Sequence, residues 1–151
     1  MLTSTPSPTK TQRHVAENPR PQRGILDTSV VINLNMLESS QLPIEVAVTA
    51  ITMAELAAGP HATSDPDERS GRQDRLQRAE AAFDPLPFDG EAARAYGRIY
   101  SAVVAAGRKA RGARAVDLLV AAIASSVEMP LYTRNADDFR SIQNLVDIIE
   151  V

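Results

Sequence analysis

Acidic residues stand at four points of this chain, each where an apolar, strand-like segment gives way to a helix-like one. Like charges a few ångströms apart cannot all stay ionised without a cation among them. A fold that gathers carboxylates at strand ends therefore favours a site for a hard metal ion, because oxygen-only ligands select Mg²⁺ or Mn²⁺ over zinc. The residues are Asp27 in GILDTSVVI, Glu55 in ITMAELAAGP, Asp117 in RAVDLLVAAIA, and the adjacent Asp137 and Asp138 in LYTRNADDF.

Each of these carboxylates also has a purely structural interpretation. Asp27 and Asp117 suit helix caps, where a carboxylate accepts backbone N–H bonds and meets the positive end of the helix dipole. Thr52 and Glu55 match the spacing of a capping box, and the pair at 137/138 suits a first helical turn facing water. The flanks of Asp27 and Asp117 are nevertheless Ile, Leu and Val, and a charge in apolar surroundings needs a partner. These flanks favour the metal site.

A basic segment directly precedes Asp117. It would bring cations beside the proposed carboxylate site, where they could hold the phosphates of a nucleic acid. The alternative is a solvated basic loop that binds nothing. The candidates for phosphate binding are Arg108, Lys109, Arg111 and Arg114, with Arg134 as a further candidate beside the late acidic pair.

The composition narrows the function classes. At 151 residues, of which 44% are hydrophobic, the chain suits one domain with a sizeable core. The absence of cysteine excludes disulfides, thiolate zinc sites and cysteine nucleophiles, and fits a cytoplasmic location. His14 and His61 lie in polar segments and are expected at the surface. No apolar run approaches the roughly 18 residues of a membrane span, and the N-terminus lacks the apolar stretch of a signal peptide.

The charge is unevenly distributed along the chain. The formal net charge is -3, but residues 1–23 are basic, so the remainder is more acidic than the whole. Prolines and polar residues dominate 1–23, and few apolar side chains there are available for burial. We expect a disordered basic arm at 1–23, which is either a functional arm or an extension without a role. Residues 24–151 are expected to form the single folded domain.

Short apolar segments alternate with helical patterns along the folded part. Ligands of open parallel sheets bind at the carboxyl ends of the strands, so Asp27 and the late acidic pair would share one sheet edge. The order favours an α/β fold with a parallel sheet covered by helices on both faces. Strands are expected at 24–26, 129–133 and 146–151, and 45–48 is expected to be a strand or the lead into a helix. Helices are expected at 27–37, 49–60, 72–83, from Asp89 to the basic loop 107–114, at 117–126 and at 135–142.

Two further expectations concern the segments between these elements. Residues 61–71 are polar and are expected to form a mobile loop. The helix that Asp89 caps is amphipathic, and a helical period places Ala93, Tyr96, Tyr100 and Val103 on one apolar face. That face suits either the core or a contact with a second copy of the chain.

These motifs, in this order, resemble those of the PIN-domain ribonucleases, specifically the VapC toxins of bacterial type II toxin–antitoxin pairs. The matching segments are ILDTSVVI, MAELAAG, the pattern R-x-x-D-x-L-x-A-A at 114–122, and LYTRNADDF, and the resemblance covers residues 24–151. It implies a three-layer α/β/α sandwich with a central parallel sheet. It also implies that Asp27, Glu55 and Asp117 hold Mg²⁺, with Mn²⁺ as an alternative.

The resemblance implies roles for further residues. The fourth acidic position falls to Asp137, Asp138 or Asn135, and we favour Asp137 as a catalytic residue. Thr28, Thr133 and Asn135 would orient metal ligands or water molecules. The implied partners are a cognate VapB-like antitoxin, whose C-terminal segment enters the acidic groove, and a second copy of the chain in a homodimer.

The implied activity is hydrolysis of phosphodiester bonds in structured RNA, such as tRNA or rRNA, by a metal-dependent endoribonuclease. Aromatic residues are scarce, with three Phe, three Tyr and no Trp, so recognition by shape and phosphates is expected over base stacking. Alternatives are a catalytically silent PIN-like module that binds RNA or protein, and an exonuclease of the RNase H type. A P-loop enzyme is excluded, because Gly107 and Gly112 are followed by Ala113 and Arg114 instead of Lys and Ser/Thr.

Overall fold

The folded domain begins a few residues before the predicted boundary. The computed structural model describes residues 20–151, and the predicted arm otherwise lies outside the described residues. Arg20 already belongs to the fold, because its guanidinium donates a 2.8 Å hydrogen bond to the carbonyl of Leu42. The first strand includes Arg23. Residues 20–23 therefore belong to the folded domain, and the predicted start at residue 24 was too late.

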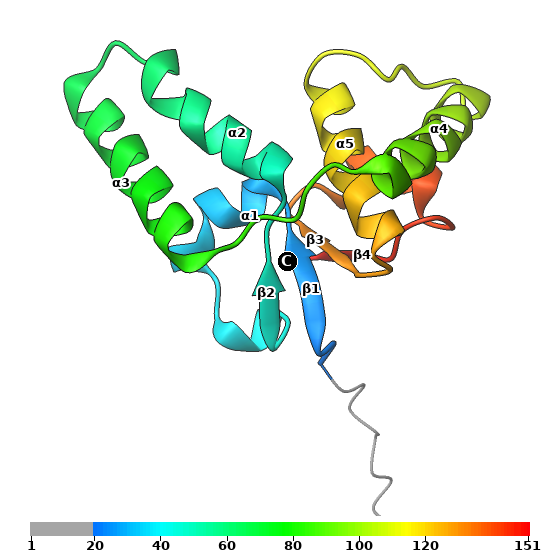
Figure 1. Ribbon diagram of the computed structural model, residues 1–151, viewed down its shortest axis with the longest axis horizontal. Coiled ribbons are helices and arrows are strands. Elements are labelled where there is room, and N and C mark those ends of the chain that lie inside the picture. Colours follow the sequence, from blue (N-terminus) through cyan, green and yellow to red (C-terminus); the bar gives the residue numbers. More distant parts are fainter. Residues whose placement is uncertain (1–19) are drawn as a thin grey trace, which may run out of the picture.

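Four short parallel strands form the central sheet, in the order β2-β1-β3-β4 (Figure 1). Every neighbouring pair is parallel, which confirms the predicted parallel sheet. The chain leaves β1 towards one edge and β3 towards the other, so the strand order reverses between these two central strands. Such a switch point is where open α/β sheets place their ligands. The strands are β1 (Arg23–Leu26), β2 (Glu45–Ala47), β3 (Leu131–Thr133) and β4 (Ile148–Glu150).

The two central strands divide their side chains between two cores. Ile25 and Leu131 pack into one cluster, while Leu26 and Tyr132 pack into the other. Successive strand residues point to opposite faces of a sheet, so both faces of this one are buried. This accounts for the continuous apolar runs in the sequence and confirms the predicted three-layer α/β/α arrangement.

Helices cover the two faces in chain order. In Figure 1, α2 and α3 stand on one side of the sheet, and α4 and α5 pack together on the other. No helix among the described residues is long and apolar enough to cross a membrane. The α-helices are α1 (Thr28–Ile32), α2 (Ala50–Ala58), α3 (Pro66–Ala82), α4 (Gly90–Ala105) and α5 (Ala113–Ser126). Short 3₁₀ segments are η1 (Leu34–Met36), η2 (Ser39–Gln41), η3 (Gly59–Ala62) and η4 (Ala136–Ile142).

The prediction of a mobile loop at 61–71 was wrong. Helix α3 starts at Pro66, where the Asp65 side chain accepts a hydrogen bond from the backbone N–H of Asp67. Proline suits the first helical position because its missing N–H would have no helical partner there. Arg72 ties the helix back to α2 through a 2.8 Å hydrogen bond to the carbonyl of Gly59. The segment is therefore held at both ends.

Helix α4 begins as predicted but buries a different face. Asp89 accepts a hydrogen bond from the N–H of Ala92 at 3.0 Å, which confirms the expected cap. Tyr100, however, is 48% exposed, so it does not belong to the core, and the alternative of a contact with a second copy stays a prediction. Small residues allow close approach of α4 to α5, and the rotation that uses them turns the tyrosine outward. The buried residues are Ala92, Ala95, Ile99 and Val103.

Candidate active site

Asp27 sits at the carboxyl end of β1, at the switch point of the sheet. Its backbone N–H donates to the carbonyl of Tyr132 at 3.0 Å, which ties this strand end to β3. Its side chain is a helix cap, accepting from Val30 N–H at 3.2 Å, and it is only 7% exposed. One oxygen of the carboxylate therefore serves the fold. The two interpretations of Asp27 are compatible, because a carboxylate offers about four acceptor sites.

Ser29 was not among the predicted site residues, yet it joins the two central strand ends. Its hydroxyl donates to Asp27 Oδ1 at 2.5 Å and accepts from the backbone N–H of Arg134 at 3.1 Å. The bond holds the Asp27 carboxylate against the turn that follows β3. A hydroxyl two residues after an acidic strand end was the available signal for this role.

Glu55 approaches the same edge from α2. Its Oε1 accepts a 2.6 Å hydrogen bond from the hydroxyl of Thr28, the first residue of α1. The hydroxyl of Thr52 lies 3.1 Å from that of Thr28. The capping box is absent, because the N–H of Thr52 bonds to Thr49, which is the true cap of α2. Glu55 is therefore free of a capping role, and the hydroxyl of Thr28 holds its carboxylate.

Asp117 lies on the inner part of α5 and not at its start. The helix begins at Ala113 after Gly112, so Asp117 is in the second turn, followed by the buried Leu118. Its interpretation as a helix cap was wrong. The carboxylate is instead delivered to the sheet edge by a helix whose next turns are buried in the core.

The charges at this edge act on one another. Burial is the main cause that raises the pKa of Asp117 to about 6, and the charges of Asp27, Glu55 and Asp138 raise it further. Arg114 opposes them and lowers it. Three other carboxylates, from three separate segments of the chain, thus lie close enough to Asp117 to disfavour its ionisation. The assignment of Asp27, Glu55 and Asp117 as metal ligands stays a prediction.

The late acidic pair divides between two environments. Asp138 contributes to the charge around Asp117 and lies 4.0 Å from Arg114 Nη2. Asp137 instead pairs with Arg140, and its carboxylate lies 3.9 Å from Arg108. The structure therefore brings Asp138, and not the favoured Asp137, towards the acidic set.

Thr133 and Asn135 shape the turn that carries Asp138. The buried hydroxyl of Thr133 accepts from the N–H of Asn135 at 3.0 Å, and the carbonyl of Asn135 accepts from the N–H of Asp138 at 3.0 Å. Both residues act on the backbone at this edge. Arg134, between them, has an exposed side chain.

The basic segment forms the connection between α4 and α5 (Figure 1). Lys109 and Arg111 are exposed. Arg108 and Arg114 are partly covered, and each lies beside a carboxylate of the late acidic pair. The four predicted phosphate-binding residues therefore fall into two groups, one already paired and one facing solvent.

The donor set fits a hard divalent cation. Asp117 and the three groups that raise its pKa are all carboxylates, the donors that Mg²⁺ and Mn²⁺ prefer, and Arg114 is the cation that opposes them. Within residues 20–151, however, no three acidic or histidine side chains converge closely enough to enclose an ion as they stand. The carboxylates are thus gathered at one edge without forming a closed ligand set.

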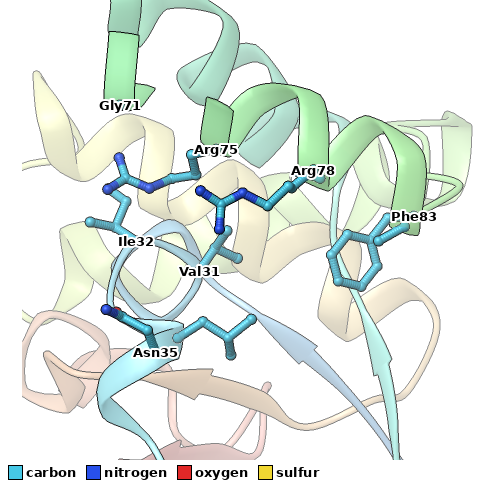
Figure 2. A pocket seen from close by; sticks show the side chains of 10 residues that line it. Val31, Ile32, Asn35, Gly71, Arg75, Arg78 and Phe83 are labelled. Atoms are coloured by element: carbon cyan, nitrogen blue, oxygen red, sulfur yellow. The ribbon is translucent and has the colours of Figure 1, made fainter. Parts of the chain in front are cut away.

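A separate groove of about 500 Å³ lies between α1 and α3 (Figure 2). None of its lining residues is acidic, so it is distinct from the carboxylate site. Val31 and Ile32 of α1 line one side of it, and Arg75 and Arg78 of α3 line the other, with Phe83 directly after that helix. The groove thus combines an apolar wall with two cations, and it shares α1 with the acidic edge.

Comparison with known proteins identifies the family. Residues 25–145 match the model of the PIN domain family. Ribonuclease VapC5 from Mycobacterium tuberculosis is 36% identical over 136 residues, which cover 87% of this chain and 97% of that protein.

Solved structures show the same fold. The crystal structure of VapBC-5 from Mycobacterium tuberculosis, a member of the VapBC family of toxin-antitoxin systems, matches with a TM-score of 0.77 and 37% identity over 87% of this chain and 100% of that one. VapBC2 from Rickettsia felis bound to a DNA fragment from its promoter matches with a TM-score of 0.68 and 21% identity, over 85% and 98%. The chain belongs to the PIN domain family, as a VapC ribonuclease.

Proposed function

We propose that this protein is a Mg²⁺-dependent endoribonuclease toxin that cleaves structured RNA, such as tRNA or rRNA, and that a cognate antitoxin inhibits it. The observation that carries the proposal is the raised pKa of Asp117 among three other carboxylates. Bringing these charges together is unfavourable in the free protein. A divalent cation relieves that cost, and so does a cationic partner.

The residues of the chain divide the work at this edge. Asp27, Glu55 and Asp117 would hold the ion, and Asp138 is the best placed fourth carboxylate. A bound Mg²⁺ or Mn²⁺ lowers the pKa of a coordinated water and offsets charge on the reacting phosphate. Thr28 and Ser29 hold Glu55 and Asp27 in place through their hydroxyls. Glu55 is the most exposed of the three ligands, which suits it to accept the proton of the attacking water.

The substrate class follows from charge and from the shortage of aromatic residues. Lys109, Arg111 and Arg134 are exposed and suit contacts with phosphate oxygens. Such contacts position a nucleic acid without reading its bases. Of the three tyrosines, Tyr132 belongs to β3 and is buried, and Tyr96 and Tyr100 lie on α4. Selectivity would then come from the shape of a folded RNA.

The antitoxin partner fits the second groove as well as the acidic edge. An apolar segment of a VapB-like protein would lie on Val31 and Ile32, and Arg75 and Arg78 would favour acidic residues at its flank. Because Asp27 caps the same helix that provides Val31 and Ile32, a segment leaving the groove along α1 reaches the carboxylates. A basic side chain at that point would take the place of the metal.

Controlled expression followed by end-mapping of total RNA tests the activity. We expect new internal ends at a small number of positions in wild type, and their loss with Asp117→Asn. The loss should be roughly 100-fold or more, because even residues that only support a metal ligand contribute 10–100-fold. Progressive shortening from the termini would indicate an exonuclease. RNA binding without new ends would indicate a silent binding module. Either result would overturn the proposal.

A further inference from the structure

Asp137 has clear contacts but no place in the acidic set. Its carboxylate pairs with Arg140 in the next turn of η4 and lies 3.9 Å from Arg108 Nη2. Its backbone carbonyl accepts a 3.0 Å hydrogen bond from Arg108 Nη1. Arg108 lies 29 positions earlier in the chain, so these contacts join two segments that the sequence keeps apart. Asp137 therefore holds the segment that carries Arg108, at a distance from the metal ligands.

The segment that it holds is the basic loop at 107–112. The loop is bounded by Gly107 and Gly112, whose φ angles of 73° and 63° lie in the left-handed region that favours glycine. Among residues 20–151, no atom other than those of its chain neighbours lies within 4 Å of the place that a Cβ would take at either glycine. The two glycines therefore serve the backbone path of the loop and not its packing.

The loop is tied to η4 on both sides. Arg108 makes the contact with Asp137, and Arg114, just beyond the loop, lies 4.0 Å from Asp138. The side chain of Arg108 is 26% exposed, against 65% for Asp137. Arg108 is thus folded back onto the protein, while Lys109 and Arg111 between the ties face solvent.

We propose that Asp137 is a positioning residue for RNA binding: by holding Arg108, it fixes the loop so that Lys109 and Arg111 meet the phosphates of the substrate beside Asp117. Arg108 then supports the loop through its contact with Asp137 and does not bind phosphate itself. The proposal rests on the proposed ribonuclease function. It assigns Asp137 to the substrate side of the site, apart from the metal.

The expected effect is small, because the ion pair is exposed. Exposed pairs contribute little to stability, so we expect Asp137→Asn and Arg108→Gln each to raise KM about two- to five-fold, with kcat and the Mg²⁺ dependence unchanged. Asp137→Glu, which keeps the charge, should recover most of the loss. Asp137→Asn is isosteric, Arg108→Gln shortens a partly exposed side chain, and a thermal melt checks that the variants fold.

A double-mutant cycle gives the sharpest test. If Arg108 acts through Asp137, the KM of the double variant should be no higher than that of the more impaired single variant. Arg111→Gln is the matched control: it should reduce the slope of RNA affinity against salt by about one unit, whereas Arg108→Gln should not. The proposal would be overturned if the two rises in KM multiplied in the double variant. It would also be overturned if Arg108→Gln reduced the salt slope of RNA affinity as much as Arg111→Gln does.

Two further results separate this proposal from the nuclease proposal. A kcat lowered tenfold or more in Asp137→Asn, or a higher Mg²⁺ requirement, would make Asp137 a metal ligand and overturn its positioning role. RNA affinity measured in EDTA, where no cleavage occurs, provides the same cycle if the wild type proves inactive. If the effects of the two variants on RNA affinity in EDTA are non-additive, the positioning role of Asp137 is supported even for an inactive protein. Additive effects contradict that role.

Discussion

The charged carboxylate of Asp117 serves the proposed metal site but destabilises the metal-free fold. It lies in the second turn of a buried helix, and its pKa is raised to about 6 by burial and by Asp27, Glu55 and Asp138. The folded protein therefore binds a proton at this site more tightly than the unfolded chain does. The consequence for stability is that the metal-free fold gains as the pH falls through 6 towards 4, and is penalised above 6. Sites built for ligands commonly carry such a cost.

Asp117→Asn should accordingly stabilise the metal-free protein at neutral pH. In EDTA at pH 7.5 we expect a gain of about 1 kcal/mol after discounting for solvent screening, or roughly 2–4 °C in Tm. The gain should shrink as the pH falls through 6 and vanish near 4, where Asp117 of the wild type is protonated. Thermal unfolding across this pH range checks the prediction. The exposed Asp84 provides the control, and an equal shift for Asp84→Asn would contradict the local origin of the effect.

Helix α1 is the element on which the site and the groove meet. Asp27 and Thr28 begin it at the acidic edge, and Val31 and Ile32 line the groove beside α3 (Figure 2). A ligand in the groove and a charge at the edge are thus connected by one short helix. An antitoxin that binds both would block the substrate and the metal together.

Ile32→Glu tests the groove without touching the chemistry. Ile32 is 43% exposed, so a glutamate fits without unfolding the domain, and we expect the affinity for the cognate antitoxin to fall about tenfold or more. Ribonuclease activity without antitoxin should stay unchanged. Ile44 is 57% exposed and does not line the groove, so Ile44→Glu is the matched control. Equal losses in the two variants, measured by calorimetry, would place the antitoxin elsewhere.

The elements show which features a sequence can reveal. Parallel strands buried on both faces give short apolar runs between polar stretches, so three strands were predicted outright and 45–48 was predicted as a strand or the lead into a helix. The predicted segments 45–48, 129–133 and 146–151 are longer than the observed strands. Asp65 and Pro66 are typical of a helix cap and a first helical position, but the start of α3 was missed because their neighbours are all polar. The face of α4 was misplaced because small residues pack there and Tyr100 turns outward.

The candidate site could be predicted where one residue stood alone in its motif. Asp27, Glu55 and Asp117 each have no acidic neighbour, and the structure brings them together. Asp137 and Asp138 are adjacent in a 3₁₀ segment, where successive residues turn by about a third of a circle. Which of them faces Asp117 depends on the exact path after β3, which Thr133 and Asn135 set and which no sequence period encodes.

At the scale of the whole molecule, the strand order explains why distant motifs converge. Reversal between β1 and β3 brings the ends of both strands to one point (Figure 1), and α2 and α5 add Glu55 and Asp117 from opposite faces. The site thus needs both layers of helices. The homodimer implied by the family resemblance stays a prediction, as does the role of the arm before Arg20.

The most direct test of the central claim is the change in Tm on titration with Mg²⁺ or Mn²⁺. At a hundredfold excess over Kd a ligand stabilises the fold by about 2.7 kcal/mol, so the wild type should show a saturable rise of roughly 5–10 °C. Asp27→Asn and Asp117→Asn should show far smaller rises, whereas Asp84→Asn should behave as wild type does. An equal rise in all four proteins, or none in the wild type, would contradict a metal site at the carboxyl ends of β1 and β3.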